Sequence, residues 1–455
     1  MINNIGLYNL NGTNGVHFSA KSAKNSAPVS ASPLQWALSG FSVQKNNVPA
    51  LNKVNTRLTN QNDIKMYNEI LNAFITSEKE KTSPQDNVLR QKKLDALLKN
   101  GTLLNNNSND KSSVLQNLYK TIKSERAANM DGVKIAGQII DTLYNPAVIT
   151  QKFGDIPKEA QVFILDKDKK TLDSSAINVE GSGTCVAASV EFHMANKQPA
   201  EFSRWAESLT SPDISVEKYI NLSALSKNTM DALWLLKEFE VKPDNFNFYR
   251  PKLKLKPDEN AIVRAQIQDN YWDKGERSIL DVLFQSTLMQ LGSQQTYDTL
   301  TDTRGGKFNS NPQGLIEFEK TFIESIVDNS ERTSVVYQNV DDKQNLIGWN
   351  CDLSIIQKNI TDAIDSGEDV IVGYVLTAQE CNETSYEPNK IVNGHEITIV
   401  DYKKDAFGNM TFVCNDTDDD KPQFVEYPAS YLLPKIHHAS YPVQIVEQYP
   451  NIAAA

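Results

Sequence analysis

The chain has 455 residues, of which 40% are hydrophobic and 23% are charged. This length allows two or three domains and a substantial core. No apolar run in the sequence approaches the roughly 20 residues that cross a bilayer, and the net charge of −11 argues against nucleic acid as the main partner.

The N-terminal stretch MINNIGLYNLNGTNG lacks the basic start and the continuous apolar core of a secretory signal. The sequence has four widely spaced cysteines without a CxxC pair, namely Cys185, Cys351, Cys381 and Cys414. This usage is typical of a reducing compartment and argues against a zinc knot or a disulfide framework. We therefore expect a cytoplasmic protein with no membrane partner, no metal and no cofactor, although export by a route without a signal peptide would leave no such mark.

The first part of the chain is basic and the remainder is acidic. Residues 1–130 carry 16 Lys and Arg against 8 Asp and Glu, whereas the rest carries 30 against 49. Residues 1–60 are rich in Asn, Ser and Lys, with no acidic residue before Asp63, which predicts a disordered lead. In 61–150, apolar residues recur every three or four positions, which predicts a helical region that serves as a prodomain or an interaction domain.

Residues 151–450 are predicted to form one domain of mixed helices and strands. Strands are expected at 160–166 and 259–267, and helices are expected from Thr184, at 228–239 and at 278–291, where Ser278 and Asp281 have capping-box spacing. Residues 303–314 are expected to form a loop. A helix at 353–367 then precedes strands at 369–377, 393–402 and 410–416.

The stretch EGSGTCVAASV (180–190) places Cys185 where a Gly/Ser turn meets the predicted helix, with Thr184 as its N-cap. The partial positive charge and free N–H groups at a helix N-terminus favour a thiolate and can stabilise an oxyanion. A thiol in this position therefore predicts a nucleophile, with a packing role as the alternative.

A nucleophilic thiol needs a base, and His395 is the best placed of the five histidines because it begins a strand. Pairing that strand with 410–417 in the register that matches Ile397 to Cys414 places His395 opposite Asp416. A slip of one residue brings Asn415 forward instead. Either side chain would orient the imidazole.

The segments GSGTC, NGHEITIVDY and FVCND, in this order, resemble the papain-like cysteine peptidases, in the style of the bacterial members. The resemblance implies an α+β fold in which a helix carrying Cys185 packs on an antiparallel sheet carrying His395 and Asp416 or Asn415. The family also uses a side-chain amide before the Cys, and Asn178 is assigned that oxyanion role. The interval of 210 residues from Cys185 to His395 exceeds the about 130–150 of papain-type enzymes, which implies an insertion within about 200–345.

These features predict a thiol hydrolase that cleaves peptide or isopeptide bonds in a peptide or protein substrate. A transamidase with the same three groups and a non-catalytic binding or effector module on the same scaffold are the alternatives. The sequence pattern suggests two other sites. The acidic run NDTDDD could bind calcium, but it lacks the Gly and the distal Glu of a calcium-binding loop. His437 and His438 lie in a C-terminal segment in which either could be a surface residue, with a metal site as the alternative.

Overall fold

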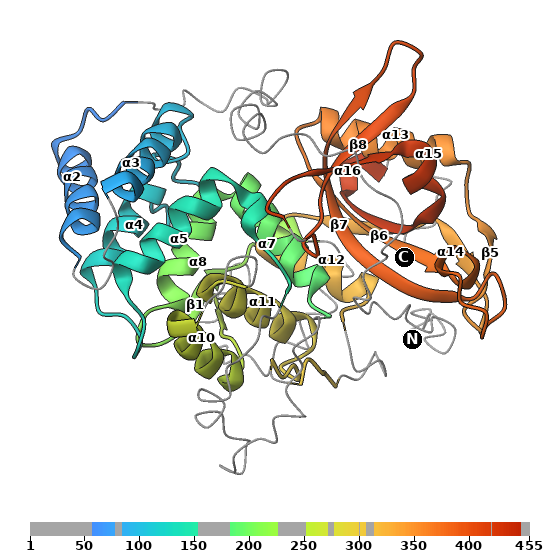
Figure 1. Ribbon diagram of the computed structural model, residues 1–455, viewed down its shortest axis with the longest axis horizontal. Coiled ribbons are helices and arrows are strands. Elements are labelled where there is room, and N and C mark those ends of the chain that lie inside the picture. The colour runs from blue at the N-terminus through green and yellow to red at the C-terminus, as the bar shows by residue number, and fades with distance from the viewer. Residues whose placement is uncertain are drawn as a thin grey trace.

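The computed structural model describes residues 57–77, 84–152, 183–225, 252–271, 277–299, 301–305, 314–419 and 421–446. The described chain is an α+β protein, with the helices up to residue 328 on one side and the antiparallel sheet, together with the later helices, on the other (Figure 1). Residues 1–56 of the predicted lead, the strand at 160–166, Asn178, the helix at 228–239 and most of the loop at 303–314 lie outside the described residues.

The predicted helical region contains four helices in the described residues, α2 (Gln61–Thr76), α3 (Pro84–Lys99), α4 (Val114–Lys123) and α5 (Gly132–Tyr144). Polar residues fix where the last two begin. Ser113 and Gln116 form a reciprocal capping box at α4, and the Asp131 carboxylate accepts from the N–H groups of Val133 and Lys134 at α5.

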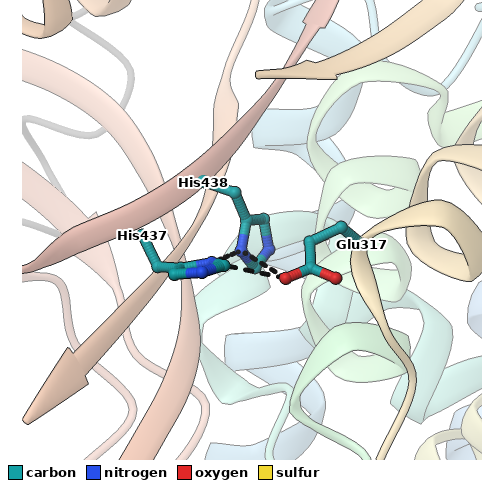
Figure 2. Close-up of side chains that lie close together, drawn as sticks. All are labelled: Glu317, His437 and His438. Atoms are coloured by element: carbon teal, nitrogen blue, oxygen red, sulfur yellow. Dashed lines mark hydrogen bonds and ion pairs between the residues drawn. The ribbon is translucent and has the colours of Figure 1, made fainter. Parts of the chain in front are cut away.

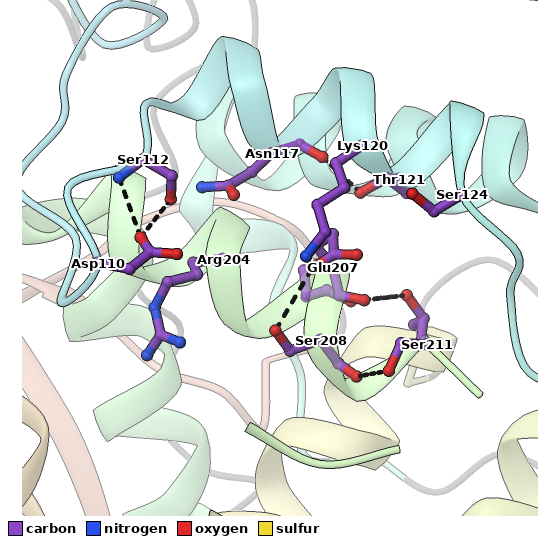
Figure 3. A network of polar contacts seen from close by, with 12 residues as sticks. Asp110, Ser112, Asn117, Lys120, Thr121, Ser124, Arg204, Glu207, Ser208 and Ser211 are labelled. Atoms are coloured by element: carbon purple, nitrogen blue, oxygen red, sulfur yellow. Dashed lines mark hydrogen bonds and ion pairs between the residues drawn. The ribbon is translucent and has the colours of Figure 1, made fainter. Parts of the chain in front are cut away.

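Polar contacts join α4 to α8 (Pro199–Leu209) (Figure 3). Lys120 Nζ lies 2.7 Å from the buried carboxylate of Glu207, and the Arg126 guanidinium lies 2.9 Å from the other oxygen of the same carboxylate. The Asn117 amide donates to the carbonyl of Ala200 and to the hydroxyl of Ser203. Because charged groups are rarely buried unless they are paired, these contacts fix α4 on α8 in one orientation.

One apolar cluster continues from the N-terminal helices into α7 (Cys185–Lys197), α8, α11 (Ile279–Gly292) and α12 (Glu317–Asp328). The helix predicted at 278–291 is confirmed as α11, with the predicted capping box between Ser278 and Asp281. This cluster crosses the predicted boundary between residues 150 and 151. The two regions therefore share one core.

The strand predicted at 259–267 is wrong, because these residues belong to helix α10 (Glu259–Tyr271). The buried residues Ala261, Arg264 and Ala265 follow the i, i+3, i+4 spacing of a helix face rather than the alternation of a strand. The Asp258 carboxylate also accepts from the N–H of Ala261, as an N-capping side chain does.

A six-stranded antiparallel sheet forms the other half, in the order β3-β10-β6-β7-β8-β9. Its strands are β3 (Arg332–Val336), β6 (Val370–Thr377), β7 (Ile391–Lys404), β8 (Met410–Asn415), β9 (Val425–Pro428) and β10 (Ile436–Pro442). Ile371 and Val375 join the core shared with α7, whereas alternate residues such as Val372 and Ile397 join a second core with α13 (Leu353–Asp365). The helix predicted at 353–367 and the three strands after it are confirmed.

The predicted hairpin register is wrong by two residues. Cys414 pairs with Ile399 rather than with Ile397, and the register shifts at a bulge between Ile399 and Asp401. β7 extends two residues beyond the prediction at each end, whereas β8 ends one residue earlier, and the Asp405 carboxylate accepts from the N–H groups of Phe407 and Asn409 in the turn between them. A shift of two preserves the face on which each side chain lies.

The remaining elements are short. They are η2 (Pro146–Val148), β1 (Val216–Tyr219), η4 (Leu222–Ala224), β2 (Lys252–Leu255), β4 (Gln338–Val340), β5 (Leu346–Trp349), α14 (Ala378–Cys381), α15 (Ala429–Leu432), η7 (Leu433–Lys435) and α16 (Val443–Val446). Within the described ranges, every helix is too short or too polar to traverse a bilayer.

Candidate active site

Cys185 is the first residue of α7, as predicted, and its side chain is buried. Thr184 occupies the N-cap position, but its hydroxyl does not cap the helix. Instead it donates to Oε1 of Gln285 on α11, 2.9 Å away, and accepts from Arg277. The turn before the cysteine is therefore held by the neighbouring helix.

A buried carboxylate holds the same turn from its other side. Asp302 accepts from the N–H of Gly183 at 2.5 Å and from the hydroxyl of Tyr297 at 2.8 Å. Burial raises the pKa of Asp302 to about 6, although the Gly183 N–H and the charge of Arg277 act in the opposite direction. The backbone that presents Cys185 is thus fixed by three side chains, those of Arg277, Gln285 and Asp302.

His395 lies on β7 beside Tyr374 of β6, whose ring meets the imidazole edge to face. Its Nε2 atom lies 2.7 Å from Oδ1 of Asp416, the residue after the end of β8. The same oxygen accepts from the N–H of Asp418, and the other carboxylate oxygen accepts from the hydroxyl of Tyr427. His395 and Asp416 therefore meet although their strands pair in an unexpected register.

The third group at this place is Cys185. Burial lowers the pKa of His395, but the charge and hydrogen bond of Asp416, together with a hydrogen bond and charge interaction with Cys185, raise it well above its ordinary value. Burial raises the pKa of Asp416, and the charge of His395 more than offsets this, so that the carboxyl pKa is lowered. The structure thus brings together the predicted thiol, imidazole and carboxylate.

Asn415, the alternative partner of His395, is placed differently. It pairs with Thr398 across the hairpin and is buried, and its side-chain amide makes no hydrogen bond within the described residues. Asp416 is therefore the residue that contacts the imidazole. Asn178, the predicted oxyanion residue, lies outside the described residues.

Gln151, which no sequence pattern predicts as a site residue, also contacts this region. Its Oε1 atom accepts from the hydroxyl of Thr417, and its N–H donates to the Thr417 carbonyl, directly after Asp416. The preceding residue, Thr150, accepts from the amide of Gln285, which also contacts Thr184. This segment therefore links the turn before Cys185 to the loop that carries Asp416. Because it lies more than 30 residues before Cys185 in the sequence, no local pattern connects it with the site.

The other histidines of the described residues lie outside this contact. His193, on α7 itself, binds Asp328 and Asp369. Neither His437 nor His438 is a surface residue, because both are buried against Glu317. Among the other cysteines, Cys414 is buried in the second core, and Cys351 and Cys381 are partly exposed.

Comparison of the chain with protein-family models, with curated proteins and with solved structures finds no significant match.

Proposed function

We propose that the chain is a cysteine-dependent hydrolase with a papain-like arrangement, acting on peptide or isopeptide bonds. The observation that carries this proposal is the contact of His395 Nε2 with Asp416 Oδ1 at 2.7 Å, on a strand that packs against the helix beginning with Cys185. Acyl transfer by a thiol uses a nucleophile, a base that contacts it and a third group that orients the base.

The charges around His395 favour its protonated form. Asp416 stabilises the protonated ring, which is why the pKa of His395 is raised. The N-terminus of α7 places partial positive charge beside the sulfur of Cys185. Because Nε2 is engaged by Asp416, Nδ1 is the ring nitrogen left to exchange a proton with the thiol.

The proposed reaction has two steps. The Cys185 thiolate attacks the carbonyl carbon, and His395 gives its proton to the departing amine as the C–N bond breaks, which leaves a thioester. His395 then removes a proton from water, the hydroxide attacks the thioester, and the thiolate leaves as the acid is released. Proton and sulfur are both restored to their starting states.

The oxyanion of each tetrahedral intermediate would lie near the free N–H groups of the first turn of α7. A side-chain amide is expected to assist. Asn178 remains a candidate by the family resemblance, and Gln151 is a second candidate because its segment contacts both sides of the site. The papain-like assignment itself is supported by the helix that begins with Cys185 and packs against the strand carrying His395.

An activated nitrophenyl ester tests the proposal without knowledge of the natural substrate. We expect a burst of nitrophenol and an acyl group that peptide mapping locates on Cys185. Cys185→Ala should abolish both, whereas Cys351→Ala, at a thiol outside the site, should retain them. An unchanged burst in Cys185→Ala would refute the assignment. Mass spectrometry of the products formed in the presence of a primary amine then distinguishes hydrolysis, which releases the acid, from transamidation, which releases the amide.

A non-catalytic binding module is the second candidate, because Cys185 is only 2% exposed. A substrate could reach such a thiol only if the surrounding groups move. The same experiment distinguishes the two candidates, since a binding module would show no acylation of Cys185.

A further inference from the structure

Two adjacent histidines on β10 direct their rings into one space (Figure 2). Successive side chains of a regular strand point to opposite faces of the sheet. Here the register of β10 against β6 shifts between Ile436 and His438, so His437 is the extra residue of a bulge. A bulge redirects a side chain, and as a result His437 Nδ1 lies only 3.0 Å from His438 Nδ1.

The position of the His438 ring depends on a glycine. His438 pairs with Gly373 on β6, and a Cβ atom at residue 373 would lie 2.2 Å from Cε1 of His438 and 2.6 Å from Oε1 of Glu396. Such distances are far inside van der Waals contact. Gly373 therefore leaves the space that the ring and this carboxylate occupy together.

A third ligand atom comes from the helical side of the molecule. Glu317, the first residue of α12, has Oε1 3.3 Å from His437 Nδ1 and 3.6 Å from His438 Nδ1. A tetrahedral zinc ion with bonds of about 2.0–2.1 Å separates its ligand atoms by about 3.3–3.4 Å. The three separations of 3.0, 3.3 and 3.6 Å are centred on this value.

The surroundings also suit a cation. Nε2 of His438 lies 2.7 Å from Oε1 of Glu396, and a carboxylate behind the far nitrogen of an imidazole orients the near nitrogen toward a metal. The other oxygen of Glu396 lies 3.2 Å from Nζ of Lys320, which offsets one of the two carboxylate charges. The Glu317 side chain is 19% exposed, which leaves an approach for an ion and a water ligand.

We propose that Glu317, His437 and His438 form a binding site for a divalent transition-metal ion, with Zn²⁺ as the best match. Two imidazoles and one carboxylate are a common zinc ligand set, and a water molecule would complete the tetrahedron. The ion would join α12 to β10, and thus the helical half to the sheet. This replaces the expectation that the chain binds no metal, and it is independent of the proposed hydrolase activity.

The test titrates the metal-free full-length Cys185→Ala protein with Zn²⁺ by calorimetry, since that background removes the thiol of the candidate active site. We expect one equivalent of bound zinc. Glu317→Gln and His437→Gln should each weaken binding at least tenfold, and Glu387→Gln, at an exposed glutamate elsewhere, should not change it.

X-ray absorption at the zinc edge of the parent protein provides a readout that does not depend on the folding of a variant. We expect nitrogen and oxygen ligands with two imidazoles and no sulfur. Failure to bind zinc, unchanged affinity in both ligand variants, or sulfur in the coordination shell would each overturn the proposal.

Discussion

At the scale of single residues, Asp416 shows how the candidate site is held together. One of its oxygens contacts His395, and the other accepts from Tyr427. A carboxylate fixed on both sides can keep an imidazole in one tautomer and one orientation. The neighbouring Asn415 has a suitable chemical type but makes no such contact.

The first prediction separates these two neighbours. Asp416→Ala should lower the rate of Cys185 acylation by about 10²–10⁴-fold, as loss of the orienting group does in other triads. Asp416→Asn should retain more activity because an amide can still hold the ring. Asn415→Ala should leave the rate within a few-fold of the parent. Stopped-flow acylation by the nitrophenyl ester measures all three, and an Asn415→Ala loss larger than that of Asp416→Ala would contradict the assignment.

The sequence predicted Cys185, His395 and Asp416 as one site because each has a local signal: a helix start, a strand start and a strand end. The register was wrong, yet the contact forms, because an error of two residues keeps each side chain on its face. Gln151 and Glu317 had no comparable signal. Each is joined to its site only by long-range contacts with Thr417 or His437.

At the scale of elements, a buried charge cluster joins α7 to the end of α12, the start of β3 and the residue before β6. His193 lies between Asp328 and Asp369, and Arg332 also binds Asp328. Burial lowers the pKa of His193, but the charges of Asp369 and Asp328 raise it to about 10. The ring therefore stays protonated in the folded chain at neutral pH.

The second prediction concerns this histidine and pH. Removing one partner of a buried ion pair costs about 3–5 kcal/mol, so His193→Gln should lower the free energy of unfolding by roughly this amount at pH 7. Because the folded-state pKa is raised, the stabilisation is complete below the unfolded value near 6.5 and is lost as pH rises through about 10.

Urea unfolding of the parent and His193→Gln between pH 6 and 10.5 measures this difference. We expect the difference between their free energies of unfolding to decrease toward pH 10.5. A difference that increases with pH would show that the ring is neutral in the folded state.

The third prediction uses the glycine beneath the two histidines. Gly373→Ala forces Cβ into the ring of His438 and the carboxylate of Glu396, so we expect a loss of about 1–3 kcal/mol from overpacking and weaker zinc binding. Gly305→Ala is the matched control, because its Cβ would meet only Thr296 at 3.8 Å. Thermal unfolding and zinc titration check both variants, and equal behaviour of the two would contradict the steric argument.

Most elements followed from local patterns, and the errors have physical causes. The segment 259–267 shows helical spacing only when Arg264 counts as a buried position, and a charged residue is not expected to be buried. The bulge on β10 arises from pairing with β6 and therefore had no signal in the local sequence.

At the scale of the whole molecule, the described helices before residue 150 and the helices after 183 share one apolar cluster. Leu118 of α4 and Ile139 of α5 belong to the same core as Trp205 of α8 and Phe284 of α11. Paired charges between α4 and α8 add to this interface. The N-terminal helices are therefore part of the fold that supports Cys185.

The fourth prediction follows from the shared core. A chain that begins at residue 150 would expose the apolar faces of α7, α8 and α11, so it should lack cooperative unfolding and bind hydrophobic dyes. Supplying residues 1–150 as a separate chain during expression should restore the native near-ultraviolet circular dichroism. A truncated chain that folds alone and gains activity would instead identify residues 61–150 as a removable prodomain.

The convergence of Cys185 with His395 is tested most directly by the alkylation rate of each thiol with iodoacetamide near pH 6. Burial raises the pKa of Cys351, Cys381 and Cys414, so these three thiols serve as internal controls. We predict that mass spectrometry finds Cys185 modified first, and that His395→Ala removes this selectivity. Equal, slow modification of all four thiols, or selectivity that persists in His395→Ala, would contradict the account.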